Sequence, residues 1–220
     1  SIHILFSIVF LLSSTAIFAQ TPQEEDAFLL AKNAFDDGFY DVGLTLFNRF
    51  LDNFPASSKA QETQFYIGQC YFYLKRYDEA ISQFNTLLSS KAIADFAPEQ
   101  EGGVYYWLAQ TNFKKNDFSK ASDFYQKLLS EYPKSPYHQQ AFYSLAWCLF
   151  EQGKFQKAKE KFSEFKNKFP LDPLVQDVDF KLAECLYNLK EYAELKSHLE
   201  RFIKSSPGIQ GLDLIKFYLG

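Results

Sequence analysis

Small and aromatic residues recur along this chain at a fixed spacing. Each of six aromatic-rich segments contains an aliphatic residue followed by Ala or Gly, and the small residues of these pairs are 37, 41, 37, 37 and 37 positions apart. These six anchor residues are Ala31, Gly68, Ala109, Ala146, Ala183 and Gly220. A constant period of this length predicts an array of structural repeats.

Other positions keep the same register. Aromatic residues stand three before, four after and nine after almost every anchor, a small residue usually stands twelve after it, and a large aromatic or Leu stands sixteen after it. A proline follows at twenty-four in every complete unit except the second, where Ala92 takes its place. Each unit therefore reads as two helices, since proline cannot continue a helix and no period-two alternation suggests a strand.

The same pattern predicts where the helices begin and end. The first helix of each unit ends near one of five residues, namely Gly38, Lys75, Asn116, Gly153 and Lys190. Ser135–Pro136 and Asp172–Pro173 fit a cap followed by the first helical residue of the next unit. Four extra residues fall within 89–103, where we expect a longer loop. Where the two helices of a unit cross, we expect their small residues to meet.

The first nineteen residues have the composition of a signal peptide. No charged residue precedes Glu24 apart from His3, and the apolar run at 4–12 is followed by a more polar stretch and Ala19. The alternative is an uncleaved membrane anchor, although the run is shorter than the roughly 20 residues that span a bilayer. Thr21, Pro22 and Glu24 then fit the capped start of a helix.

These signals give a division of the chain. We expect a signal peptide at 1–19 and a repeat domain at 20–220, with repeats at about 24–58, 59–98, 99–136, 137–173 and 174–210 and a partial one at 211–220. The absence of Met and the apolar final segment indicate a chain truncated at both ends. After signal cleavage we expect no stable membrane span.

The columns of small, aromatic and proline residues resemble the tetratricopeptide repeat. The resemblance covers residues 24–220, although the usual repeat has 34 residues. It implies an all-α solenoid of stacked antiparallel helix pairs, a right-handed superhelix of about five repeats plus the start of a sixth. Repeats ending in FPASSKA or YPKSPY are similar to those of Gram-negative envelope proteins. Two relatives fit this description, the lipoprotein of the outer-membrane β-barrel assembly machinery and the periplasmic protein of the Tol-Pal system. The first is opposed by the absence of a cysteine near Ala19, and the second by the absence of an N-terminal coiled coil.

The resemblance also implies a partner-binding groove along the first helices. At about 100° per residue, the positions three before, one after and four after each anchor share a side of the helix. The predicted groove residues are Phe28, Lys32, Phe35, Phe65, Gln69, Phe72, Tyr106, Gln110, Phe113, Tyr143, Trp147, Phe150, Phe180, Glu184 and Tyr187. The alternative for each aromatic residue is simple packing against the neighbouring repeat.

The net charge and the potentially reactive residues narrow the range of functions that the sequence supports. The net charge of -4 makes nucleic acid an improbable partner. Cys70, Cys148 and Cys185 share a column of small residues and are expected to serve packing, with no disulfide. His138 and His198 are expected on exposed helix surfaces, and no sequence motif of an enzyme, metal or cofactor site occurs.

The sequence thus predicts an exported, non-enzymatic scaffold of the bacterial cell envelope, periplasmic or associated with the outer membrane. It would bind protein or peptide partners, with no cofactor and no nucleic acid. Two alternatives stay open. One is the recognition arm of a larger enzyme or regulator that continues past residue 220, and the other is a peptidoglycan- or glycan-binding module that stacks sugars on its aromatic groove.

Overall fold

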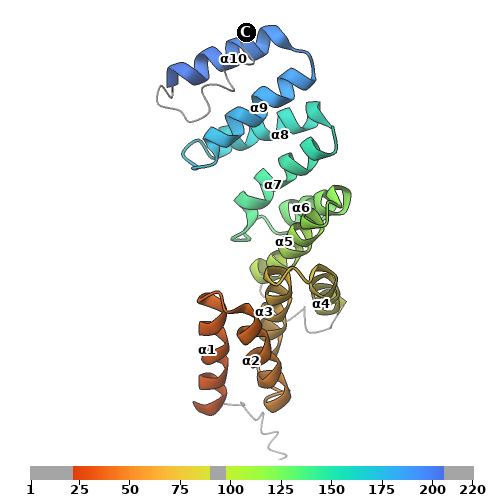
Figure 1. Cartoon of the computed structure of the whole chain (residues 1–220), viewed down its shortest axis with the longest axis vertical. Coiled ribbons are helices and arrows are strands. Elements are labelled where there is room, and N and C mark those ends of the chain that lie inside the picture. Colours follow the sequence, from red (N-terminus) through yellow and green to blue (C-terminus); the bar gives the residue numbers. More distant parts are fainter. Residues whose placement is uncertain (1–21, 90–97, 206–220) are drawn as a thin grey trace, which may run out of the picture.

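The computed structural model describes residues 22–89 and 98–205. Within them lie ten α-helices and no strand. The helices are α1 (Pro22–Asp36), α2 (Tyr40–Asn53), α3 (Ala60–Tyr73), α4 (Tyr77–Ser89), α5 (Pro98–Lys114), α6 (Phe118–Glu131), α7 (His138–Glu151), α8 (Phe155–Lys168), α9 (Val175–Asn188) and α10 (Tyr192–Ser205). They form five sequential antiparallel pairs that stack along the long axis of the molecule (Figure 1), which confirms the predicted architecture.

Each helix packs mainly against the helices next to it in sequence. The second helix of one pair therefore fills the space between its own first helix and the first helix of the next pair. The columns at twelve and sixteen residues after the anchor provide this packing, with Ala80, Ala121 and Ala158 and the rings of Phe84, Tyr125 and Phe162 fully buried. One pair cannot bury its apolar faces alone, so the stack of neighbours makes the core.

The five predicted first-helix ends share one turn geometry. Gly38, Lys75, Asn116, Gly153 and Lys190 all have positive φ, between 60° and 80°. At the first of them, the Gly38 N–H donates to the Phe35 carbonyl and the Phe39 N–H donates to the Ala34 carbonyl. These two bonds form a Schellman motif, which satisfies carbonyls that the helix end leaves free.

The second helices end where the proline column predicts. Helices α2, α6 and α8 each stop two residues before their proline, at Asn53, Glu131 and Lys168. Pro22 is the first helical residue of α1, as predicted, whereas Thr21 and the signal segment 1–19 lie outside the described residues, as do Pro207 and the partial sixth repeat.

Several local predictions are wrong. Residues 98–103 are the first part of α5 and not a loop, and residues 90–97 of the predicted loop lie outside the described residues. Helices α7 and α9 begin two residues later than predicted, because Pro136 and Pro173 lie in turns. Asp172 still caps locally, since its Oδ1 accepts from the Leu174 N–H at 2.6 Å.

The close contacts of the glycines also differ from the expected meeting of two small residues. A Cβ on Gly68 would lie 2.5 Å from Cε1 of Phe84, so the ring of the second helix lies directly on the glycine. A Cβ on Gly43 would lie 3.5 Å from the backbone nitrogen of Phe35. At these two crossings, therefore, Gly68 lies against the ring of Phe84 and Gly43 lies against the backbone and Cβ of Phe35.

Three polar residues are partly or fully enclosed, and for two of them, His138 and His198, the prediction of an exposed position is wrong. Glu24 is buried and accepts a hydrogen bond of 2.5 Å from the Ser57 hydroxyl. His138 is half-buried, and burial lowers its pKa. His198 is half-buried too, with Nε2 2.9 Å from the Asp179 carbonyl and 3.6 Å from its carboxylate. Glu24 is covered from the turn after α2 and His198 from α9, and the sequence of one helix does not show such contacts.

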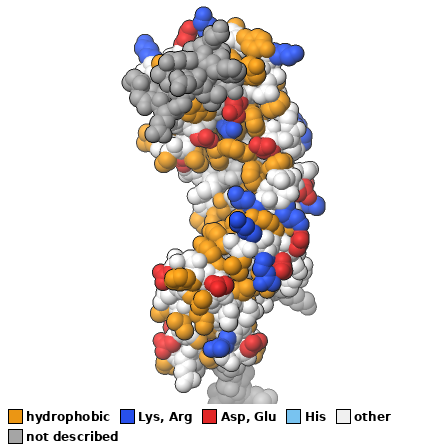
Figure 2. Space-filling view, viewed as in Figure 1, with side chains coloured by type: hydrophobic (Ala, Val, Ile, Leu, Met, Phe, Trp, Pro, Cys, Tyr) orange, Lys and Arg blue, Asp and Glu red, His pale blue; other side chains and the backbone are white. Residues whose placement is uncertain are grey.

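Within the described residues, no helix combines the length and the apolar character that crossing a membrane requires. Figure 2 shows hydrophobic side chains spread along the visible face, with Lys and Arg side chains gathered beside them over the middle of the molecule.

Candidate functional site

The fifteen predicted groove residues all lie on the first helices, three on each of α1, α3, α5, α7 and α9. Phe28 and Gln69 are buried, with 6% and 5% of their surface exposed. Tyr187 is exposed, and the other twelve are half-buried.

In the N-terminal half, the groove residues contact aromatic rings of neighbouring helices. The Phe28 ring packs against Phe50 and Tyr66, and the Phe72 ring packs edge-on against Trp107 with centroids 5.1 Å apart. The sequence reading did not include Tyr66, Tyr73 or Trp107 in the groove, although these residues link one pair to the next. Rings of the predicted groove therefore also take part in packing between repeats in this half of the chain.

Four of the predicted residues meet around one small cavity. Gln110 and Phe113 of α5 and Tyr143 and Trp147 of α7 line a space of about 230 Å³, together with Tyr125 and Ser144. We call this space the aromatic pocket. Small-molecule and cofactor sites usually have volumes of roughly 300 Å³ or more. The aromatic pocket is smaller than that, so its size matches one side chain of a partner protein.

The polar atoms at the aromatic pocket are neutral. The buried Tyr125 hydroxyl has no hydrogen-bond partner of good geometry within the described residues, although the neighbouring Ser144 side chain lowers its pKa. Burial outweighs that effect and raises the pKa of Tyr125 well above its usual value. Burial and the hydrogen bond to Asp177 likewise raise the pKa of Tyr143. Both phenols therefore keep their protons, and Tyr125 has hydrogen-bonding capacity to offer a ligand.

Charged groups lie at the edge of the aromatic pocket nearest α9. The Lys181 Nζ stands 4.2 Å from the centroid of the Trp147 ring and forms a 2.8 Å ion pair with Glu184. The Trp147 indole N–H donates to Glu151 at 3.0 Å. These contacts fix the Trp147 ring at the mouth of the pocket, because each holds a different part of it.

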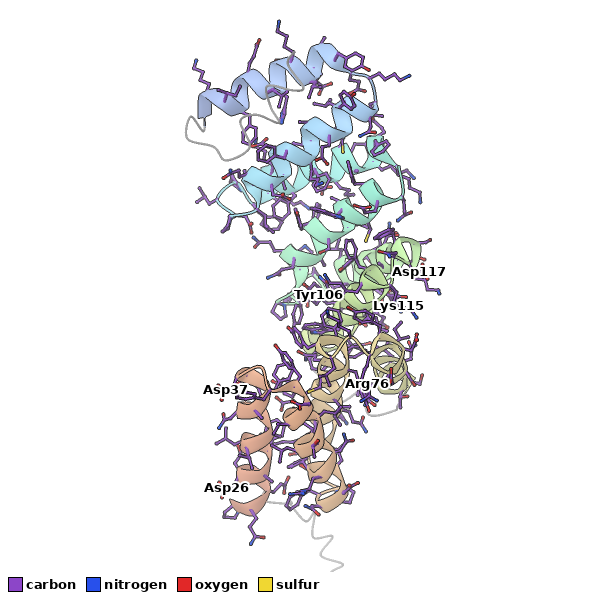
Figure 3. All side chains as sticks on the ribbon, in the orientation of Figure 1. Asp26, Asp37, Arg76, Tyr106, Lys115 and Asp117 are labelled. Atoms are coloured by element: carbon purple, nitrogen blue, oxygen red, sulfur yellow. The ribbon has the colours of Figure 1, made fainter. Side chains whose placement is uncertain are left out.

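Tyr125 and Ser144 are functional candidates that the sequence reading missed. Tyr125 belongs to the column sixteen after the anchor, which packs between helices, and Ser144 stands two before Ala146. The only signal in the sequence was that both are polar in columns that are otherwise mostly apolar. In Figure 3, Tyr106 lies on one side of the α5–α6 pair and Lys115 and Asp117 lie on the other, so the two sides carry different chemistry.

The three cysteines are buried and free. Burial raises the pKa of each thiol from 9.0 to about 12. A thiol in that state is a poor nucleophile and a poor metal ligand. No group of three His, Cys, Asp or Glu side chains that could hold a metal ion occurs among the residues in 22–89 and 98–205.

Family profiles match most of the chain in three segments. Residues 28–98 and 104–135 match two tetratricopeptide-repeat profiles, and residues 142–220 match the profile of YfiO, described as an outer membrane lipoprotein. A search of curated protein sequences gave no match.

Solved structures share the fold at low sequence identity. A tetratricopeptide-repeat protein from Parabacteroides merdae has 16% identity and a TM-score of 0.71, covering 91% of this chain and 75% of that one. The C-terminal part of a repeat protein from Cytophaga hutchinsonii has 19% identity and a TM-score of 0.66, covering 83% and 66%. MamA from Desulfovibrio magneticus has 13% identity and a TM-score of 0.67, covering 84% and 96%.

Of the two envelope relatives that the sequence suggested, the profile match points to the outer membrane lipoprotein. The repeats, the five helix pairs and the profile matches together show that this chain is a tetratricopeptide-repeat protein, and its residues 142–220 match the profile of the YfiO outer membrane lipoprotein.

Proposed function

We propose that this protein is a non-enzymatic scaffold of the bacterial envelope that binds a segment of a partner protein across its first helices. The matched families are scaffold families associated with protein partners, and the YfiO profile is that of an outer membrane lipoprotein. The observation that carries the proposal is the aromatic pocket, where two neighbouring repeats leave an unfilled space lined by rings.

The aromatic pocket accepts one anchoring side chain of the bound segment. The rings of Phe113, Tyr143 and Trp147 supply apolar contact, and the Tyr125 hydroxyl supplies a hydrogen bond at its base. Buried aromatic anchors commonly carry most of the energy of a protein interface. Lys32, Phe35, Phe65, Phe72, Tyr106, Phe150, Phe180, Glu184 and Tyr187 extend the same row on both sides of the pocket.

The test is cross-linking capture from envelope extract with the full chain and two variants. Trp147→Ala removes the ring at the mouth of the aromatic pocket, whereas Tyr192→Ala removes an exposed ring that does not line it. We expect both the wild type and Tyr192→Ala to capture the same defined protein and Trp147→Ala to lose it. Equal capture by all three proteins would place the interface elsewhere.

A second measurement identifies the class of ligand. The chain has two Trp residues, so Trp107→Phe leaves Trp147 as the only tryptophan reporter. A segment of the captured partner should shift the Trp147 emission on binding. A shift with peptidoglycan fragments and none with the partner segment would favour the glycan-binding alternative instead.

A further inference from the structure

Three grooves lie between successive second helices, apart from the aromatic pocket. One is bounded by α4 and α6, one by α6 and α8, and one by α8 and α10, with volumes of about 360, 880 and 460 Å³. The first helix between each pair of walls forms the floor, because the walls pack against that helix more than against one another. The three grooves are therefore the same feature of the repeat, seen three times.

The floors differ in one decisive way. Phe142, Leu145 and Leu149 make the floor of the α6/α8 groove, and all three are apolar. Thirty-seven residues later, the floor of the α8/α10 groove has Asp179 in place of Phe142. In the α4/α6 groove, thirty-seven residues earlier, Asn112 stands in place of Leu149. Of the three, only the α6/α8 groove, whose volume is the largest, has no polar side chain at these floor positions.

Polar partners already occupy the floors of the two outer grooves. Asn112 donates to the Leu108 carbonyl at 2.8 Å. The buried Asp179 carboxylate forms a 2.5 Å ion pair with Lys166 and faces His198 at 3.6 Å. In the α6/α8 groove the three floor side chains are apolar and 3–6% exposed, so no polar side chain stands at these positions.

The α8 wall of this groove is basic. Lys154, the N-cap of α8, and Lys157 and Lys161 line it at spacings of three and four, so they follow one stripe, with Glu160 as the one acidic residue of this wall. Lys157 forms no ion pair within the described residues, and Lys154 donates only to the Gln152 amide oxygen, at 2.6 Å. The equivalent wall residues in the α8/α10 groove are Glu191, Glu194 and His198.

The opposite wall is mostly uncharged. Helix α6 contributes the hydroxyls of Ser119, Ser122 and Ser130 and the amide of Gln126, with Asp123, Lys127 and Glu131 adding charges of both signs. Helix α8 itself carries five Lys and two Glu in a chain whose net charge is -4. Positive charge is thus concentrated along one edge of an apolar trough.

We infer that the α6/α8 groove binds an acidic amphipathic helix of a partner protein. Apolar residues at i, i+3 and i+7 of that helix rest on Phe142, Leu145 and Leu149. Carboxylates along one flank face Lys154 and Lys157, which fixes the orientation of the bound helix, whereas Lys161 already pairs with Glu164 at 2.7 Å. This surface is separate from the aromatic pocket and does not depend on the proposed function of that pocket.

The probe is a fluorescein-labelled synthetic helix of 14 residues, the same length as α6, α7 and α8. It carries Leu at i, i+3 and i+7 and Glu along one flank. A second peptide has the same Leu positions and Lys in place of Glu. Fluorescence anisotropy with the full chain should show saturable binding of the acidic peptide and much weaker binding of the basic one.

The variants use residues that the fold already accepts at equivalent positions. Lys154→Glu/Lys157→Glu copies Glu191 and Glu194, and Glu is also favourable near the start of a helix. Leu149→Asn copies Asn112, whose side chain bonds to the carbonyl four residues earlier. Lys196→Glu, on the exposed surface of α10, is the control for a change of charge alone. Circular dichroism checks that each variant is folded.

We expect the double Lys→Glu variant and Leu149→Asn each to weaken the acidic peptide about tenfold, and Lys196→Glu to leave it unchanged. Higher salt should weaken binding in the wild type and not in the double variant. No saturable binding, equal binding of both peptides, or equal binding by the folded groove variants would overturn the inference. So would binding of phosphatidylglycerol vesicles, sensitive to the same variants, in a protein that ignores the peptide, because the groove would then serve a membrane surface.

Discussion

At the scale of single residues, the turns between paired helices each contain a residue with positive φ. Substitutions at two of these positions should change the free energy of unfolding in opposite directions. Lys75 has φ of 61° in the turn after α3, where Gly avoids the steric cost of a Cβ. Gly153 occupies the same position after α7 at φ 70°, with open space where a Cβ would lie. We expect Lys75→Gly to raise the free energy of unfolding by about 0.5–1 kcal/mol and Gly153→Ala to lower it by a similar amount. Urea denaturation measures both, and changes of the same sign would contradict the explanation.

The cysteines give a second prediction at this scale. Because burial raises each thiol pKa from 9.0 to about 12, the folded state holds protons that the unfolded chain releases. Their contribution to stability is complete below pH about 9 and is lost as the pH rises toward 12. The thiols should therefore react with a disulfide reagent at pH 8 only after unfolding. A thiol that reacts at once in the native protein would show that its helix opens locally.

At the scale of helices, the contact between α3 and α4 has almost no free space. Gly68→Ala puts a methyl group against the fully buried Phe84 ring. The gain in helix propensity is about 1 kcal/mol, whereas overpacking costs about 1–3 kcal/mol. We expect a net loss of stability in thermal unfolding. Phe84→Leu in the same chain should restore part of the loss, and additive effects of the two changes would indicate that the ring does not press on residue 68.

The positions of helices could be predicted because the repeat period is carried by residues with clear local roles. Proline ends α2, α6 and α8, and Gly38 and Gly153 end α1 and α7. The start of α5 could not, since Gly102 and Gly103 read as loop residues. A Cβ on Gly102 would lie 2.9 Å from Ser135, and one on Gly103 would lie 3.0 Å from Tyr137. These glycines allow close packing with a turn from the next repeat, a contact that local propensity does not contain.

At the scale of the whole molecule, stability should vary along the stack. Helix α10 packs against α9 and has no following helix within the described residues, whereas α6, α7 and α8 have neighbours on both sides. In a linear array, each repeat is stabilised by its neighbours. Hydrogen exchange should therefore be slowest in α6–α8 and faster in α10. Uniform protection from α1 to α10 would mean that the array unfolds as a single unit.

The candidate sites could be predicted only in part for a related reason. Helical periodicity identified Gln110, Phe113, Tyr143 and Trp147, and the structure brings these four around one cavity. The same periodicity gave Phe28 and Gln69, which neighbouring helices cover. The sequence did not predict the grooves between second helices, because each groove is formed jointly by helices of two neighbouring repeats. Which neighbouring helix covers a given side chain depends on the angle between successive helix pairs, and the sequence alone does not give this angle.

Helix α7 contributes to both proposed surfaces. Phe142, Leu145 and Leu149 face the α6/α8 groove, and Tyr143, Ser144 and Trp147 face the aromatic pocket, on opposite sides of a helix about 10–12 Å across. Two ligands bound there would be separated by a single rigid rod. If either one shifts or rotates that rod, it alters the affinity of the other, and thermodynamic linkage requires the two effects to be equal in size. Helix α7 would then couple the binding of two partners, so that each partner changes the affinity for the other although the two never touch.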